Sequence, residues 1–254
     1  MITVGIDCGT RNIKAIVLQD GRIAGTSIVP AGFDTRADAR RAFDEALLRA
    51  GMKRADVTRI IATGAGRKAV DFASDDIAIE SADAKGIVCL LPGVRTVIDV
   101  GAEEGRALRV TADGIYTDCA VNERCAAGAG TFMETMARAL EIGFDEMSDL
   151  YFQSTKEITM SAQCVVFAES EMVSLIHSRT PKPDIVRAII NAIADRVVSI
   201  MKMVGFENDV AAIGGVSLNK GFKDAVERRI KMAIIVPPEP LFVSALGAAY
   251  SGVE

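Results

Sequence analysis

The sequence predicts an α/β fold of two similar lobes, because a strand-rich segment occurs twice. The copies are "IDCGTRNIKAIVLQDGRIAGTSIV", from residue 6, and "IDVGAEEGRALRVTADGIYTDCAV", from residue 98. Each consists of an apolar strand, a glycine loop, a second strand, an Asp-Gly turn and a third strand. Asp7 matches Asp99 and Lys14 matches Arg106, both at an offset of 92 residues. A duplicated unit of this kind predicts two lobes with a cleft for a ligand.

Helices and strands follow each copy in turn. In the first half, the apolar spacing predicts a helix near residues 35–50, a strand at "VTRIIATG" and a helix near residues 82–91. In the second half it predicts helices near residues 129–142, 164–178, 184–204 and 219–231, and strands at "DVAAIGG" and "AIIVP". We therefore expect an N-terminal lobe over residues 1–95 and a C-terminal lobe over residues 96–254.

Local signals predict how several helices end. Gly143 and Gly205 follow two of the predicted helices and are expected as their C-caps, and Asp184 is expected as the N-cap of the long helix that starts there. The small-residue helix "SALGAAYSG", residues 244–252, is expected to pack against the first lobe rather than to bind a ligand.

Composition excludes several classes of function. The 254 residues are half apolar, and 34 acidic residues outnumber 29 basic ones without any block dense in Lys or Arg. We therefore expect no nucleic-acid partner. No apolar run reaches membrane-spanning length, and "MITVGIDCG" leads directly into a strand without a secretory signal. We expect a cytoplasmic protein that has no membrane partner.

The two glycine loops are candidate phosphate-binding sites. Glycine lets backbone N–H groups approach a phosphate closely, so Gly9 and Gly101 are expected to bind one. Asp7 and Asp99 are expected to hold a hydrated Mg²⁺, which usually takes one or two protein carboxylates. Thr10 and Lys14 would add a hydroxyl and a positive charge. An Asp-x-Gly loop alone is more simply a hairpin turn, but its repetition at matched positions favours binding.

A third glycine cluster, "AAIGGVSLNKGF", follows a predicted strand and opens a helix. Gly214 and Gly215 would let a nucleobase or ribose approach the backbone closely, and Asn219 stands where the helix begins. A pair of glycines after a strand is weak evidence alone. Here it is the third glycine element of a set, so we include these three residues in a nucleotide site.

The chain contains an odd number of cysteines, widely and unevenly spaced, at positions 8, 89, 119, 125 and 164. In a chain expected to be cytoplasmic, this pattern argues against a disulfide framework. Cys8 is expected as a small filler in the first loop and Cys89 as a core residue. Cys125 and Cys164 each precede a predicted helix, whose positive N-terminal end would stabilise a thiolate. They are either metal ligands or packing residues.

The three glycine elements together resemble the phosphate and adenosine motifs of the acetate kinase, sugar kinase, heat-shock chaperone and actin superfamily. The resemblance implies an actin-like, ribonuclease H-like fold that clamps Mg-ATP or Mg-ADP. "NERCAAGAGTFMETMARAL" and "SAQCVVFAESEMVSLI" resemble one branch of it: the electron activators of 2-hydroxyacyl-CoA dehydratases and the ATPase subunits of benzoyl-CoA reductase. This branch resemblance covers nearly the whole chain.

The branch resemblance implies a 4Fe-4S cluster at Cys125 and Cys164, shared across a dimer. Two thiolates per chain cannot complete a four-thiolate site, so two chains would have to meet there. Gly128, Gly130 and Thr131, just after Cys125, are expected to belong to the nucleotide cleft and to link it to the cluster.

The implied function is an ATPase that drives low-potential electrons to a larger iron-sulfur partner. The second loop reads Gly101-Ala102-Glu103-Glu104, where dehydratase activators usually have Gly-Gly-Gln-Asp. This "GAEEGRA" form favours a benzoyl-CoA reductase subunit paired with a related ATPase subunit. The alternative is a homodimeric dehydratase activator. Ferredoxin or flavodoxin is the expected electron donor.

The residue that positions the attacking water is Glu103, Glu104 or neither, and we take Glu103 as the catalytic candidate. A small-molecule kinase and a non-redox actin-like ATP-binding protein are the remaining alternatives. The kinase would need a base beside a substrate pocket, and the sequence shows no extra domain to build one.

Overall fold

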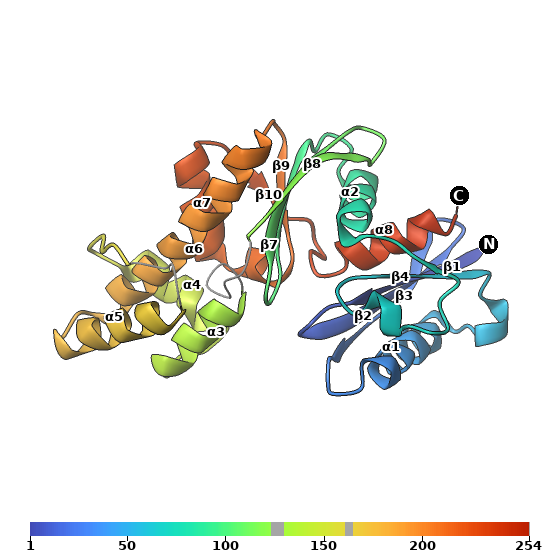
Figure 1. The fold of residues 1–254 in the computed structure, drawn as a ribbon, viewed down its shortest axis with the longest axis horizontal. Coiled ribbons are helices and arrows are strands. Elements are labelled where there is room, and N and C mark those ends of the chain that lie inside the picture. The colour runs from blue at the N-terminus through green and yellow to red at the C-terminus, as the bar shows by residue number, and fades with distance from the viewer. Residues whose placement is uncertain (123–129, 161–164, 254) are drawn as a thin grey trace. The chain divides into compact units, whose positions relative to one another are not determined.

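The protein contains two compact units, each built on one five-stranded sheet (Figure 1). The computed structural model describes residues 1–122, 130–160 and 165–253. Unit 1 comprises Met1–Val97, Val110–Thr117 and Pro237–Glu254, and unit 2 comprises Ile98–Arg109 and Asp118–Val236. The division therefore differs from a single cut near residue 95, because a β-hairpin tip and the C-terminal segment belong to unit 1.

The two sheets have the same strand order. The sheet of unit 1 runs β3-β2-β1-β4-β5, and the second runs β8-β7-β6-β9-β10. The strands of the first are β1 (Ile2–Cys8), β2 (Asn12–Gln19), β3 (Arg22–Pro30), β4 (Arg59–Thr63) and β5 (Asp75–Asp76). Those of the second are β6 (Thr96–Val100), β7 (Gly105–Val110), β8 (Tyr116–Val121), β9 (Val210–Ile213) and β10 (Ile234–Ile235). The duplication read from the sequence thus extends to the strands that follow each copy.

Helices cover both faces of the first sheet, and the alternation of side chains along β2 explains how. Ile13 and Val17 point into one core, which includes Phe43 of α1 (Thr35–Ala50). Ile16 and Leu18 belong to a second cluster with residues of α8 (Val243–Ser251). Figure 1 shows α1 and α8 on opposite sides of this sheet. Burial on both faces makes β2 almost continuously apolar.

The C-terminal helix α8 packs closely on unit 1 because glycines remove side chains at its contacts. A Cβ on Gly247 would lie 1.8 Å from the Ala82 carbonyl oxygen of α2 (Ile79–Leu90), and one on Gly5 would lie 1.9 Å from the Ala245 carbonyl oxygen. The Ser244 hydroxyl donates to Asp83 Oδ1 at 2.6 Å, in a buried contact between α8 and α2. The small residues of "SALGAAYSG" therefore serve packing.

Unit 2 buries one large core between its sheet and its helices. The central element is α6 (Lys182–Val204), which contributes fourteen buried residues and contacts both α4 and α7. The other helices are α3 (Gly130–Ala139), α4 (Phe144–Gln153), α5 (Val165–His177) and α7 (Lys220–Ile230). Short 3-10 helices lie at Arg54–Asp56, Arg67–Ala69 and Gly215–Leu218.

Two of the three predicted helix caps are wrong. Gly205 does end α6, with a φ of 64°. Gly143 instead precedes α4, a helix not predicted from the sequence, and Glu141 takes the left-handed conformation after α3. Helix α6 begins at Lys182 after Pro181, so Asp184 lies inside its first turn. Proline at a helix start is favourable because it has no N–H to leave unpaired.

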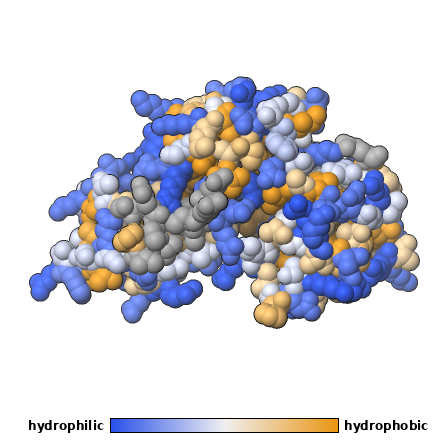
Figure 2. Space-filling model, in the orientation of Figure 1, coloured by the Kyte–Doolittle hydropathy of each residue, from blue (hydrophilic) through white to orange (hydrophobic). Residues whose placement is uncertain are grey.

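Hydrophilic side chains cover much of the visible face, with apolar ones among them (Figure 2). Among the described residues, no helix is both long enough and apolar enough to cross a membrane.

Candidate functional site

In unit 1, the end of β1 holds a buried carboxylate beside a lysine. Asp7 lies directly opposite Lys14 of β2, and the Lys14 ammonium donates to Asp7 Oδ2 at 2.8 Å. The Asp7 side chain is 4% exposed, and its Oδ1 has no hydrogen-bond partner within the described parts of the chain. Gly9 and Thr10 lie in the following turn, where Thr10 is exposed. A buried carboxylate oxygen of this kind is suited to a metal-bound water or a cation.

Gly64, which is not among the residues predicted for the site, closes on this carboxylate from the end of β4. Its φ is +87°, and a Cβ there would lie 2.5 Å from Asp7 Oδ1 and 2.7 Å from the Cys8 carbonyl oxygen. Only glycine fits such a place without strain. A signal was present in the sequence, since Gly64 and Gly214 each follow an apolar strand in their half of the chain.

Unit 2 has the same arrangement of a buried aspartate, a basic side chain and a positive-φ glycine. Gly214, after β9, has a φ of +82°, and a Cβ there would lie 2.5 Å from Asp99 Oδ1. Arg106 Nη1 donates to Asp99 Oδ2 at 2.9 Å. Arg106 Nη2 also donates to Glu104 Oε2 at 2.5 Å, whereas the neighbouring Glu103 is exposed. The structure therefore distinguishes the two glutamates: Glu104 binds the arginine beside Asp99.

The second loop is hydrogen-bonded to the start of α3. The N–H of Gly101 donates to the Glu104 carbonyl at 2.9 Å, which closes the loop. The N–H groups of Gly130 and Thr131 donate at 2.8 Å to the carbonyls of Gly101 and Ala102. These two N–H groups are therefore engaged within the protein. Their expected contact with nucleotide stays a prediction, and the observed contact is with the loop itself.

The third glycine cluster lies beside the second loop. The side chain of Val216 would be 3.3 Å from a Cβ on Gly130, and Gly214 contacts Asp99 as described. Gly215 begins the 3-10 helix that leads to Asn219. Asn219 is 2% exposed, its Oδ1 accepts from the Phe222 N–H at the start of α7, and its Nδ2 has no partner among the described residues. The predicted adenosine residues and second phosphate loop thus share one region of unit 2.

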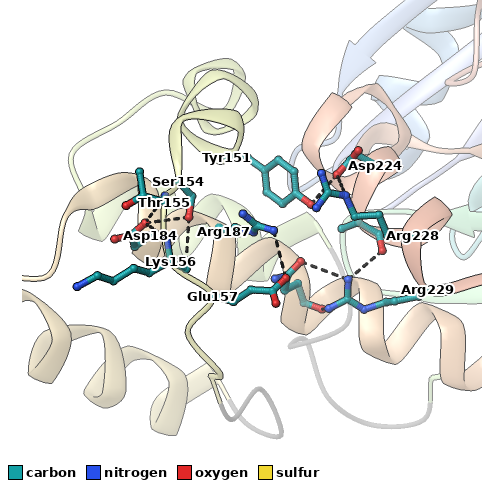
Figure 3. A network of polar contacts seen from close by, with 12 residues as sticks. Tyr151, Ser154, Thr155, Lys156, Glu157, Asp184, Arg187, Asp224, Arg228 and Arg229 are labelled. Carbon is teal, nitrogen blue, oxygen red and sulfur yellow. Dashed lines mark hydrogen bonds and ion pairs between the residues drawn. The ribbon is translucent and has the colours of Figure 1, made fainter.

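A polar network in unit 2 joins α4, α6 and α7 (Figure 3). Asp184 Oδ1 accepts from the Ser154 hydroxyl at 2.8 Å and from the N–H groups of Thr155 and Lys156 at 2.9 and 3.0 Å. Burial alone would raise the pKa of Asp184, but these hydrogen bonds hold its pKa below the usual value. The carboxylate predicted as a helix cap instead fixes the segment after α4.

Tyr151 of α4 forms the other part of the network. Its hydroxyl donates to Asp224 Oδ2 of α7 at 2.8 Å, and Arg187 of α6 lies over its ring, 5.7 Å from the centroid. Burial, together with the bond to the Asp224 carboxylate, raises the pKa of Tyr151 to about 12. Helices α4, α6 and α7 are therefore held together by polar as well as apolar contacts.

The described cysteines differ in environment. Burial raises the pKa of Cys8 to about 12, with a further contribution from the Asp7 carboxylate, so its thiol stays protonated at neutral pH. Cys89 is exposed, which corrects its assignment to the core. Cys125, Cys164 and Gly128 lie outside the described residues. Elsewhere along the described chain, no three His, Cys, Asp or Glu side chains group to hold a metal ion.

Comparison with known sequences gives full-length matches. The model of the BadF/BadG/BcrA/BcrD ATPase family matches residues 4–252. The activator of lactoyl-CoA dehydratase from Anaerotignum propionicum is 38% identical over 100% of this chain and 98% of its own. One of the subunits of benzoyl-CoA reductase from Thauera aromatica is 31% identical over 99% of this chain and 93% of its own.

Solved structures of related proteins also match this chain over nearly its whole length. Component A of (R)-2-hydroxyglutaryl-CoA dehydratase from Acidaminococcus fermentans is 35% identical, with a TM-score of 0.95 and all of both chains covered. The activator of 2-hydroxyisocaproyl-CoA dehydratase from Clostridium difficile, with bound ADPNP, is 33% identical, with a TM-score of 0.93 over 99% of this chain and 94% of its own. The two-lobed α/β fold and the branch resemblance are confirmed. This chain belongs to the BadF/BadG/BcrA/BcrD ATPase family.

Proposed function

We propose that this protein is the ATP-hydrolysing electron activator of a 2-hydroxyacyl-CoA dehydratase. The observation that carries this choice is the full-length similarity to dehydratase activators from three organisms, each at higher identity than the benzoyl-CoA reductase chain. The expectation of a reductase-type partner is therefore less well supported than its alternative. The acyl-CoA that the dehydratase uses is not part of the proposal.

The residues around both loops fit Mg-ATP. Gly64 and Gly214 let the backbone approach Asp7 and Asp99 closely, since a Cβ on either glycine would lie 2.5 Å from the aspartate Oδ1. Asp7 Oδ1 is buried without a partner among the described residues. We propose that these carboxylates hold the hydration shell of Mg²⁺, which spreads the charge of the phosphates. Lys14 and the loop N–H groups would bind phosphate oxygens. Glu103, exposed in the second loop, is the candidate for orienting the attacking water.

The second loop supplies a route from nucleotide to cluster. Its carbonyls at Gly101 and Ala102 bind the first two residues of α3, and α3 begins five residues after Cys125. A shift of this loop on ATP binding or hydrolysis would move the start of α3, because two hydrogen bonds at 2.8 Å join them. We propose that Cys125 and Cys164 of two copies hold one 4Fe-4S cluster, which supplies the transferred electron.

The proposed partners follow from this role. A second copy of the chain completes the cluster ligands, a larger iron-sulfur dehydratase accepts the electron, and ferredoxin or flavodoxin donates it. One feature favours the reductase alternative: the "GAEEGRA" loop, in which Arg106 binds Glu104. In that case the second ATPase subunit would be a related chain instead of an identical one.

Anaerobic purification, reconstitution with iron and sulfide, and metal analysis test the proposal. We expect about four irons per two chains, broad visible absorption, and ATP-dependent electron transfer to a dehydratase. Cys125→Ala and Cys164→Ala should lose the cluster and retain binding of an ATP analogue. Cys89→Ala is the matched control, because Cys89 is exposed and outside the proposed ligand set. An iron-free protein after reconstitution rules out the redox function and leaves the kinase or assembly alternatives.

A further inference from the structure

Arg106 of the second loop is shared by two carboxylates of different exposure. Its Nη1 donates to Asp99 Oδ2 at 2.9 Å and its Nη2 donates to Glu104 Oε2 at 2.5 Å. The side chains of Arg106 and Asp99 are 7% and 10% exposed, whereas that of Glu104 is 59% exposed. The bond to Asp99 is therefore a fixed part of the interior, and the bond to Glu104 is open to exchange.

We propose that Glu104 competes with the phosphates of ATP for the guanidinium of Arg106, and thereby lowers the affinity for nucleotide. A guanidinium binds carboxylate and phosphate oxygens with the same forked geometry, so one anion can replace the other. Displacing the exposed Glu104 side chain costs little, because an exposed carboxylate regains its hydration when it leaves an ion pair. Displacing the buried Asp99 would leave a charge without compensation.

The first loop has no such competitor. Asn12 matches Glu104 at the same offset of 92 residues, and Lys14 matches Arg106. Lys14 donates to Asp7, and the sequence between these two residues contains no other acid. From Asp7 to Lys14 the segment contains one acidic and two basic residues, while from Asp99 to Arg106 it contains three acidic residues and one basic residue. An incoming phosphate therefore meets a competing carboxylate of the loop itself only at the second loop.

This inference rests on the proposed function, because it requires ATP phosphates at the second loop. Its test measures the Kd of the full chain for the non-hydrolysable imido analogue of ATP, by calorimetry. We expect Glu104→Gln to lower the Kd about fivefold, the upper end for an exposed ion pair. Glu104→Asp should also lower it, because the shorter side chain retains the charge but cannot reach Nη2. Asp118→Asn, which removes the charge of an exposed acid on the neighbouring strand β8, is the control and should change the Kd less than twofold.

The outcomes distinguish competition through the Glu104–Arg106 contact from general repulsion between acidic side chains and phosphate. If Glu104→Asp leaves the Kd unchanged, or if Asp118→Asn lowers it as much as Glu104→Gln, repulsion explains the effect and competition at Arg106 is wrong. Equal affinity in every variant also overturns the inference, while the proposed function stands. If neither the wild type nor any variant binds the analogue while thermal unfolding shows folded protein, the proposed function fails together with the inference.

Discussion

The two units use one plan for their carboxylates but differ in what surrounds them. In each unit an aspartate near the end of a central strand forms an ion pair with the basic side chain seven residues later. The nitrogen–oxygen distance is 2.8 Å to Lys14 in unit 1 and 2.9 Å to Arg106 in unit 2. A positive-φ glycine that follows the neighbouring strand closes on the same aspartate in each unit. Unit 1 then supplies a lysine and a loop without acids, whereas unit 2 supplies an arginine and two glutamates.

Under the proposed function, the two loops would have different roles. The first loop has a surplus of positive charge and a buried carboxylate oxygen without a partner in the described structure, which suits phosphate and a hydrated cation. The second loop has a surplus of acid and hydrogen bonds to α3, which suits water positioning and the transmission of movement.

The largest effect is expected from removing the basic side chain that pairs with the buried aspartate of each unit. Lys14→Met and Arg106→Met should each lower the free energy of unfolding by about 3–5 kcal/mol, because a buried carboxylate loses its partner. Arg106→Met should cost more, since its guanidinium binds two carboxylates. Urea unfolding measures both. Arg228→Met, which removes an exposed ion pair with Asp224, is the control and should cost under about 1 kcal/mol. If Lys14→Met loses more free energy of unfolding than Arg106→Met, the prediction that the second carboxylate contact of Arg106 adds stability is wrong.

Alanine at the two closing glycines tests whether the units are equivalent. Gly64→Ala and Gly214→Ala should each cost about 3 kcal/mol, since positive φ and a contact at 2.5 Å both oppose a Cβ. Gly51→Ala, also at positive φ but in open space, should cost only about 1 kcal/mol. Thermal unfolding provides the measurement. A cost at Gly64 or Gly214 no greater than at Gly51 means that the close approach to the aspartate is absent.

Asp34 in unit 1 caps a helix, whereas Asp184 in unit 2 accepts hydrogen bonds from a segment distant in the sequence. Asp34 caps its own helix α1 through the Ala37 N–H, a role that asparagine fills equally well, so Asp34→Asn should be nearly neutral. Asp184→Asn should cost about 1–2 kcal/mol at pH 7, because three donors lose a charged acceptor.

The pH dependence of stability gives a second test of Asp184. Its folded pKa is lowered, so its contribution is present above the unfolded pKa of about 3.9 and is lost as pH falls through the folded pKa. Acid unfolding of Asp184→Asn should lack this component. The same acid unfolding profile in both proteins rules out the network as a source of stability.

The smallest effects concern one tyrosine in each unit. Tyr151→Phe should cost about 1 kcal/mol, since a partly buried hydrogen bond from its hydroxyl to the charged Asp224 carboxylate is lost. Tyr250→Phe should cost about half as much, because its acceptor, the Gly21 carbonyl oxygen at 2.9 Å, carries no charge. The raised pKa of Tyr151 stabilises the fold below about pH 10, and this contribution is lost as pH rises through about 12. Tyr151→Phe should remove this alkaline component of the pH dependence of stability. If the pH dependence is unchanged in the variant, Tyr151 is not its source.

Local patterns predicted most elements because their signals lie within a few residues. Helix α1 runs from Thr35 to Ala50, as the spacing indicated, and the repeat located three strands of each sheet, while the two-residue strand β5 was not predicted. Helix α4 was missed, because its short apolar pattern follows α3 after only a brief turn. Asp184 was misassigned because a good capping residue near a helix start gives no sign of distant donors at Ser154 and Lys156.

The sequence by itself determined the duplication, the aspartate and cation matched in each copy, and the glycine elements, because strand periodicity and loop composition are local properties. Only the tertiary structure decided that Gly64 closes on Asp7, that Glu104 and not Glu103 binds Arg106, and that the second loop holds α3. These contacts depend on how strands distant in the chain pair and in which register. A hydrogen bond requires donor and acceptor to meet within about 3 Å, which residue types alone do not specify.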